Sequence, residues 1–504
     1  MKSNKFFFWL KTILFCGMIL FCCVIGFVLP LRPEISDLES RRLTEFPEFD
    51  MEDFVSGKYT SDINLWYSDT FPGRDWLVER NGDLKNLYGI KTTAFDSGSG
   101  NKDEINMDET FIWDDSGFET TDTPDSGTTT PDDPEITMPN DPEETTCEDP
   151  ETTTDGTGTA APDDSDTTTS ETSAPDTPDK PDTPDTPTED EPIIGETIDG
   201  YYVKGDTAYQ LYYFNKQNAD RYARSVMNLA IKLKGLADVY SMIAPTSSVI
   251  GLSDKEIEVL GMSNGKDGIE YIHRAIAAYS EQLMAMDKIS SPVQTIGLYD
   301  CLNAHRDEYI FYRTDHHWTG LGAYYASRYF LDTVGKSYPS LDQYKEIKID
   351  GFLGTLYSYT QNANLKNHPD TVYAYESPTV KNFQVLYKDA TALKVKPIIN
   401  PNVTSSNKYL CFITGDRPYS VIHNETINDG SSILIIKDSF GNAFSPMLAD
   451  SYEYVHIIDY RHWSGDLAEF VQENNIDTVL LLLNIRATAS DTSMGNLENF
   501  LKNN

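Results

Sequence analysis

The sequence predicts an α/β domain with a mostly parallel sheet, joined by an acidic linker to an N-terminal transmembrane helix. Three observations support this prediction. From residue 196 onward, short apolar segments alternate with amphipathic segments of helical period. Residues 12–29 carry no charge, and residues 121–190 consist mainly of Thr, Pro and acidic residues.

The N-terminal apolar run has the length of a membrane span. Its 18 uncharged residues, TILFCGMILFCCVIGFVL, form a helix of roughly 27 Å, close to a bilayer core of about 30 Å. Lys2, Lys5 and Lys11 precede the run and favour a cytoplasmic N-terminus. The alternative is a cleaved signal peptide, but Pro30 follows where a small-residue cleavage site is needed. We therefore expect an uncleaved anchor in residues 1–30, with the rest of the chain outside the cytoplasm.

The negative charge is concentrated in one segment. The 504 residues carry 80 acidic and 40 basic side chains, a net charge of −40, and residues 101–190 contribute −27 of it. Residues 121–190 contain 21 Thr and 12 Pro, a composition that buries too little apolar surface to fold. We predict a disordered linker at 97–195, between a membrane-proximal segment at 31–96 and a domain at 196–504. This charge argues against a nucleic-acid partner, which requires a basic face.

The linker prediction has a direct test in a deletion. Removing residues 121–190 should leave the thermal unfolding transition of the protein nearly unchanged, because a segment without packed contacts contributes little to stability. Differential scanning calorimetry of the shortened and complete chains measures this. A fall of many degrees would show that the segment packs on the domain.

Within 196–504 the pattern predicts an alternating order of helices and strands. Helices are expected at 219–238, 267–287, 320–334, 443–448 and 465–473, and strands at 239–244, 293–298, 309–313, 432–436, 454–458 and 478–483. The last strand, TVLLLL, is apolar on both faces, as in parallel sheets covered by helices. Residues 343–430 are expected to be irregular and rich in β-structure. Cys301 and Cys411 either pair or remain buried thiols.

The first chemical cluster is RTDHHWT at 313–319, which follows the expected strand 309–313. In an extended segment, Asp315 and His317 point to one side and His316 to the other. An Asp beside a His orients the imidazole and stabilises its cation. The alternative is a polar strand end whose histidines only satisfy hydrogen bonds.

The second cluster is IKDSFGN at 436–442, a strand followed by a polar turn and a helix. Ser439 stands at the strand end, where a nucleophile gains from exposed backbone N–H groups. The turn is not G-x-S-x-G, and Ser439 as a helix N-cap is the alternative. A nucleophilic Ser needs a base, and both clusters follow predicted strands, so a parallel sheet would bring them to one edge.

At these residues the chain resembles a known family, the bacterial DHHW proteins. The resemblance rests on FYRTDHHWTGLGAYYA (311–326), IIKDSFGNAFSPMLADSYEYVHIIDYRHW (435–463), RPEISDLESRRLTEFPEF (32–49) and SDTFPGRD (68–75). DHHW proteins resemble the alginate O-acetylation proteins, whose catalytic domains have a three-layer fold similar to that of SGNH hydrolases. In these domains the catalytic motifs follow a chain order that is permuted relative to ordinary SGNH enzymes. The resemblance implies that Asp315 orients, His317 is the base and Ser439 is the nucleophile.

Further residues near the two motifs are candidates for substrate contacts. Asn442 or nearby backbone N–H groups are candidates for stabilising an oxyanion, and Arg313 and Arg461 for contacting carbohydrate or carboxylate. His316 and Trp318 are candidates for shaping the pocket, although Trp318 fits a core position equally well. No metal or cofactor is expected.

The resemblance implies an O-acetyltransferase or acetylesterase that acts on a cell-surface polysaccharide. Transfer requires an acetyl donor outside the membrane, and the resemblance implies a multi-pass membrane acyltransferase as that partner. One alternative is a metal-dependent phosphoesterase, since Asp-His-His occurs in DHH phosphoesterases, but their further Asp and His motifs have no counterpart here. The other is a non-catalytic polysaccharide-binding or scaffold protein of the same fold.

Overall fold

The computed structural model describes residues 195–503 except Asp199 and Asp389, residues 102–113, and scattered positions between 35 and 72. The expected anchor at 1–30 and linker core at 121–190 lie outside the described residues. Within the described part of the chain, no helix has both the length and the apolar character needed to cross a bilayer.

A mixed α/β fold with one large sheet is observed. The sheet has eight strands in the order β11-β10-β12-β14-β13-β15-β6-β7. The bounds are β6 Asp238–Ala244, β7 Gln294–Ile296, β10 Asn382–Leu386, β11 Lys394–Pro397, β12 Tyr419–His423, β13 Ser432–Lys437, β14 Tyr454–Asp459 and β15 Thr478–Asn484. The five strands from β14 to β7 are parallel, and β12, β10 and β11 extend the sheet in antiparallel pairing.

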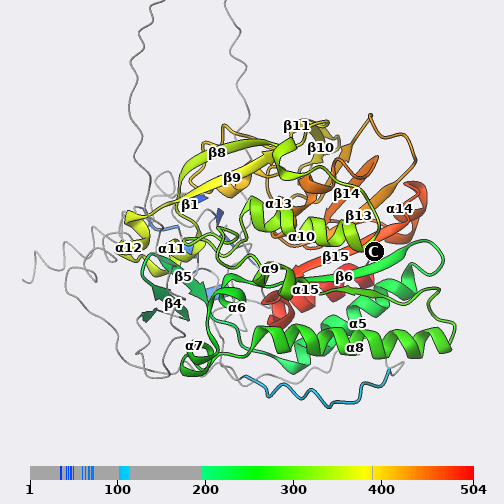
Figure 1. The fold of residues 1–504 in the computed structure, drawn as a ribbon, viewed down its shortest axis with the longest axis horizontal. Helices are drawn as coiled ribbons and strands as arrows, with labels where there is room; N and C mark the ends of the chain where they lie inside the picture. The colour runs from blue at the N-terminus through cyan, green and yellow to red at the C-terminus, as the bar shows by residue number, and fades with distance from the viewer. Residues whose placement is uncertain are drawn as a thin grey trace, which may run out of the picture. The chain divides into compact units, whose positions relative to one another are not determined.

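Helices cover both faces of the parallel part (Figure 1). On one face lie α5 (Lys216–Lys232), α8 (Gly265–Ala285) and α15 (Asp491–Asn503), and on the other lie α9 (Leu298–Asn303), α10 (Gly320–Thr333) and α13 (Gly441–Phe444). All six residues of β13 are buried, as expected for a strand that is apolar on both faces.

The periodic segments fold as the sequence predicts, with small shifts at their ends. The expected helices at 219–238, 267–287 and 320–334 correspond to α5, α8 and α10, and five expected strands correspond to β6, β7, β13, β14 and β15. The predicted strand 309–313 is wrong, because this stretch contributes only one bridge, Phe311 to Trp318. The sequence pattern also gave no indication of α15. Cys301 and Cys411 are free thiols.

Smaller sheets flank the large one. Antiparallel strands β3 (Glu196–Ile198), β4 (Tyr201–Lys204) and β5 (Thr207–Gln210) form one of them. Strands β8 (Lys345–Phe352) and β9 (Asp370–Glu376) form a second, and the short helix α11 (Thr355–Thr360) follows β8. The segment 310–319 is hydrogen-bonded to Ala208 in β5 of the first small sheet and to Asp370 in β9 of the second.

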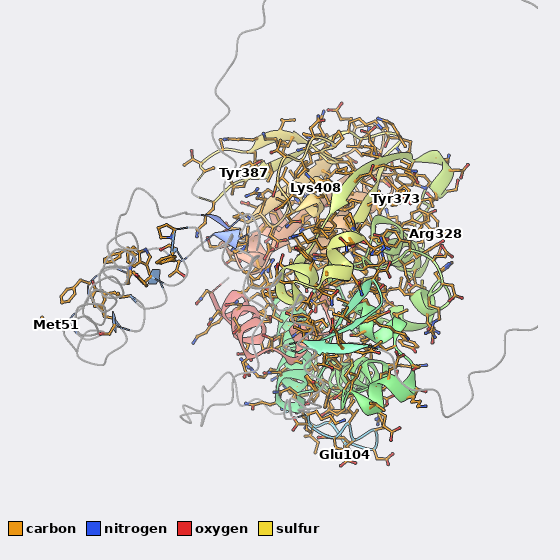
Figure 2. All side chains as sticks on the ribbon, turned by 90° about the vertical axis from the view of Figure 1, so that its left-hand side faces the viewer. Met51, Glu104, Arg328, Tyr373, Tyr387 and Lys408 are labelled. Atoms are coloured by element: carbon orange, nitrogen blue, oxygen red, sulfur yellow. The ribbon has the colours of Figure 1, made fainter. Side chains whose placement is uncertain are left out.

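Residues 102–113 pack against the helices on one face of the domain, although they fall in the range assigned to the linker. The backbone N–H of Trp113 donates to Gln282 Oε1 at 2.9 Å, and Gln282 Nε2 donates to the Phe111 carbonyl at 2.9 Å. Phe111 is buried against Tyr271. Figure 2 places Glu104 at the surface on this side of the domain. The linker prediction rested on the composition of the whole segment, which is strongly acidic, and that composition does not reveal the few apolar residues of this stretch.

Candidate active site

Ser439 stands in a turn between β13 and α13 that is fixed by its neighbours. Asp438 Oδ1 accepts from the Phe440 N–H at 2.9 Å, and Asp438 Oδ2 accepts from the backbone and side-chain N–H groups of Asn484 at 2.7 and 2.8 Å. These bonds tie the turn to the end of β15. Ser439 itself is only partly buried, whereas its neighbours Asp438 and Phe440 are buried.

The segment 313–317 forms a compact loop rather than an extended strand. The loop is closed by the Thr319 N–H, which donates to the Ile310 carbonyl at 2.9 Å. The Asp370 carboxylate accepts from the Thr314 N–H at 2.7 Å and from the Thr314 hydroxyl at 2.6 Å. The Arg313 carbonyl accepts from the Ala208 N–H at 2.9 Å. Strands β5 and β9 thus hold the loop from two sides.

This loop brings three side chains into a hydrogen-bonded series. His317 Nδ1 lies 2.6 Å from Asp315 Oδ1, and His317 Nε2 lies 2.7 Å from Ser439 Oγ. An ionised carboxylate only accepts, so Nδ1 carries the proton and Nε2 accepts from the serine hydroxyl. The series has the connectivity of a nucleophile, a base and an orienting acid.

Asp315 is buried and held by a residue that the sequence analysis missed. Its second oxygen accepts from the Thr355 N–H at 2.9 Å and from the Thr355 hydroxyl at 3.1 Å. A Cβ on Gly354 would lie 2.3 Å from Asp315, so only glycine fits there. Burial opposes ionisation of Asp315, but His317, His316 and these donors together hold its pKa below the ordinary value. Asp315 therefore stays charged.

His316 lies beside His317, and the alternation argument that separated them is wrong. The two ring centroids are 3.8 Å apart, and His316 Nδ1 lies 2.6 Å from the Thr355 hydroxyl. Asp315 still meets His317 because its carboxylate also accepts the backbone N–H of His317, two residues along the loop, at 3.0 Å. A local turn, and not strand periodicity, therefore brings the pair together.

Tyr409 is a second residue without a sequence signal. Its ring stacks on His317 with centroids 4.0 Å apart and planes at 12°, and its hydroxyl donates to the Ser439 carbonyl at 3.2 Å. Tyr409 therefore contacts both the His317 imidazole and the turn at residues 438–440, which is called the serine turn below. It lies in an irregular region with no recognisable motif, so only the folded structure reveals that Tyr409 contacts His317 and Ser439.

The surroundings of His317 set the pH below which its imidazole could no longer act as a base. Burial lowers the pKa of His317 below its ordinary 6.5, His316 acts in the same direction, and Asp315 opposes them. A base must be neutral, and activity is lost as pH falls through its pKa, so the acid limb of kcat/KM should lie below about 6.5. A pH–rate profile with p-nitrophenyl acetate measures this. A midpoint at or above 6.5 would show that the Asp315 charge outweighs burial.

Two other predicted residues have structural contacts. Trp318 is fully buried, and its indole N–H donates to the Phe440 carbonyl at 3.0 Å. This bond joins the loop at residues 313–317, called the histidine loop below, to the serine turn. Arg313 Nη1 donates to Asp206 at 2.6 Å, and its Nε donates to Asp370 at 3.3 Å. Both side chains brace the loop, and contact with substrate stays a prediction for Arg313.

Asn442 and Arg461 join a buried charge network beneath the serine turn. Asp416 accepts from Lys437 Nζ at 2.6 Å, from Asn442 Nδ2 at 2.8 Å and from Arg461 Nη2 at 2.8 Å. Asp459 accepts from Lys437 at 3.0 Å and from Arg461 at 2.6 Å. These bonds engage the Asn442 amide and the Arg461 guanidinium within the protein, and a contact of either with substrate stays a prediction.

The same loop contains a group with metal-ligating atoms. Ligand atoms of Asp315, His316 and His317 lie within 4.8 Å of one another, and all three side chains are buried. Both ring nitrogens of His317 have partners, Asp315 and Ser439. An ion bound by this group would have to replace those bonds, so the observed geometry fits proton transfer better than metal ligation.

Comparison with known proteins agrees with the two motifs. A family model described as DHHW protein matches residues 39–126 and 164–458. Similar solved structures include a DHHW family protein from Eubacterium siraeum, with 27% identity, 62% of this chain and 98% of that chain covered, and a TM-score of 0.53. They also include Bacillus cereus PatB1 with a sulfonyl adduct, with 18% identity, coverage of 61% and 98%, and a TM-score of 0.46.

The O-acetyltransferase domain of Pseudomonas putida AlgJ is a further similar structure, with 13% identity, coverage of 61% and 98%, and a TM-score of 0.33. Comparison with curated proteins gives no match. The family match covers well over half of the chain and includes both the histidine loop and the serine turn. The chain therefore belongs to the DHHW protein family.

Proposed function

We propose that this protein is a serine O-acyltransferase or esterase that moves acetyl groups to or from a cell-surface polysaccharide. The observation that carries the proposal is the continuous series from Asp315 through His317 to Ser439, with atom pairs at 2.6 and 2.7 Å. Such a series removes the proton from a hydroxyl as the oxygen attacks a carbonyl carbon.

The reaction proceeds in two steps. Ser439 Oγ bonds to the carbonyl carbon of an acetyl ester while His317 Nε2 takes the serine proton. The ester C–O bond breaks, and the leaving alcohol takes that proton from His317. A sugar hydroxyl or water then gives its proton to His317 and attacks the acetyl carbon. The bond between that carbon and Ser439 Oγ breaks, Oγ takes the proton back from His317, and the acetylated sugar or, with water, acetic acid leaves.

The negative charge on the carbonyl oxygen needs donors. The Ser439 N–H donates to no acceptor among the described residues, so it is available to the oxyanion. The Asn442 amide already donates to Asp416 and is fully buried, which makes the Ser439 N–H the better candidate. Each such donor contributes about 10²–10³-fold in rate.

The polymer substrate and cellular setting rest on the sequence. The uncharged run at 12–29 would anchor the chain with the domain outside the cytoplasm, where surface polysaccharide is the available polymer. Transfer draws its acetyl group from a multi-pass membrane acyltransferase, and hydrolysis needs none. Membrane fractionation with external protease digestion tests this topology. Soluble chains that begin after Pro30 would contradict the anchor.

An acyl-enzyme trap tests the chemistry. The complete protein is mixed with p-nitrophenyl acetate, quenched in acid and digested, and the peptide that contains Ser439 is analysed by mass spectrometry. One added acetyl group on Ser439, absent in Ser439→Ala, is expected. Release of nitrophenol without any serine adduct, or an adduct on another residue, would contradict the proposal. Retained polysaccharide binding without an adduct would favour a non-catalytic binding protein.

A further inference from the structure

A cavity separate from the serine site lies between the loop after β14 and the last turns of α15. Its volume is about 400 Å³, within the range of small-molecule sites. The residues that define its chemistry are Arg461, Trp463, Ser464, Asn496, Asn499 and Asn503. It thus combines an aromatic ring with several amide groups.

The polar groups of this cavity are available to a ligand. The side chains of Asn496, Asn499 and Asn503 have no hydrogen-bond partner among the described residues, and neither does the indole N–H of Trp463. All three Asn side chains are open to solvent to some degree. Asn496, Asn499 and Asn503 are spaced by three and four residues, which places them on one face of α15. Each amide has donors and an acceptor, so the row matches a series of hydroxyl groups.

The aromatic ring is fixed in place. Trp463 is half-buried, packs on Phe470 and Phe500 at centroid distances of 5.8 Å, and lines the cavity. A Cβ on Gly465 would lie 2.8 Å from the indole, so the absence of a side chain there lets the ring lie against the backbone. A rigid aromatic ring beside amides suits the apolar face and hydroxyl edge of a sugar ring.

The charge of the cavity indicates a neutral ligand. Among the described residues that line it, Arg461 is the one cation, and its guanidinium is paired with Asp416 and Asp459. Lys437 is bonded to the same two carboxylates, so two cations offset two anions. The remaining charged lining residue, Asp466, is acidic and caps α14 (Leu467–Glu473). A polyanion would therefore meet no uncompensated positive charge.

We infer that this cavity is a binding site for neutral, hydroxyl-rich sugar units of a glycan chain. It begins at Tyr460, directly after β14, and β14 pairs in parallel with β13, which leads into Ser439. The two sites are further joined by Asp416, which bonds both Arg461 and Asn442. Binding at the cavity does not rest on acyl transfer at Ser439.

Calorimetric titration of the complete chain tests the site. The chain carries Ser439→Ala, so that no turnover occurs, and the probes are cellopentaose, chitopentaose and, as the anionic comparator, tetragalacturonate. At least one neutral pentamer should bind, and tetragalacturonate should bind more weakly. Asn499→Ala should weaken binding about fivefold, the effect of one lost hydrogen bond. Trp463→Ala and Gly465→Ala should each weaken it more than about tenfold.

The control is Asn364→Ala on α12 (Ala363–Asn367), an exposed Asn outside the cavity, which should leave binding unchanged. If Trp463→Ala lowers the thermal transition, Asn499→Ala decides, because its exposed side chain has no bond to lose. The inference is overturned if neither neutral pentamer binds at millimolar concentration, if these variants leave the affinity unchanged, or if tetragalacturonate binds as tightly.

Discussion

Ser439→Ala and His317→Ala should each lower acetyl ester turnover by on the order of 10⁴- to 10⁶-fold, and the double variant should lose little more. The reason is that proton removal by His317 has no use without the Ser439 hydroxyl, and the hydroxyl is a poor nucleophile without the base. Initial rates with p-nitrophenyl acetate, corrected for the spontaneous reaction, measure all three variants. Multiplicative losses in the double variant would show that the two residues act independently.

Neighbouring residues provide matched controls. Asp315→Asn should cost about 10⁴-fold or less, because the amide retains the shape but removes the charge that fixes the imidazole tautomer. His316→Ala should cost much less than His317→Ala, since His316 bonds Thr355 and not Ser439. If His316→Ala lowers the turnover as much as His317→Ala does, the assignment of His317 as the base is wrong.

Lys437→Met should reduce the free energy of unfolding by about 3–5 kcal/mol. The substitution leaves two buried carboxylates, Asp416 and Asp459, with Arg461 as the one cation that still bonds them among the described residues. Burial by itself would raise the pKa of Asp416, but Lys437 and Arg461 hold it well below its ordinary value, so it stays ionised. Breaking a buried ion network exposes this desolvation cost, and urea unfolding measures it.

Lys502→Met is the matched control, because Lys502 is exposed on α15. It should change the free energy of unfolding by less than about 0.5 kcal/mol. A loss of under 1 kcal/mol for Lys437→Met would contradict the prediction. Such a result would mean that the network relaxes or admits water when its lysine is removed.

The sequence by itself indicated the secondary structure wherever periodicity was strong, and its two motifs, through their resemblance to the DHHW proteins, indicated the three residues of the proposed series. β13 and β15 contain short apolar runs, the pattern of buried strands, and α8 is a long amphipathic segment, the pattern of a helix with one buried face. Ser439 and His317 each have a common structural explanation when taken alone, and it was the two motifs together, with their resemblance to the DHHW proteins, that indicated a nucleophile and a base.

Only the tertiary structure decided how these residues meet and what supports them. The 313–317 loop is bent by bonds to Asp370 and Ala208, which lie 57 and 105 positions away from Arg313 in the chain, so no local pattern records the bend. Thr355 and Tyr409 have ordinary sequence surroundings, yet one holds Asp315 and the other stacks on His317. Long-range packing fixes such contacts, because each depends on where distant strands place their ends and not on the residues beside it.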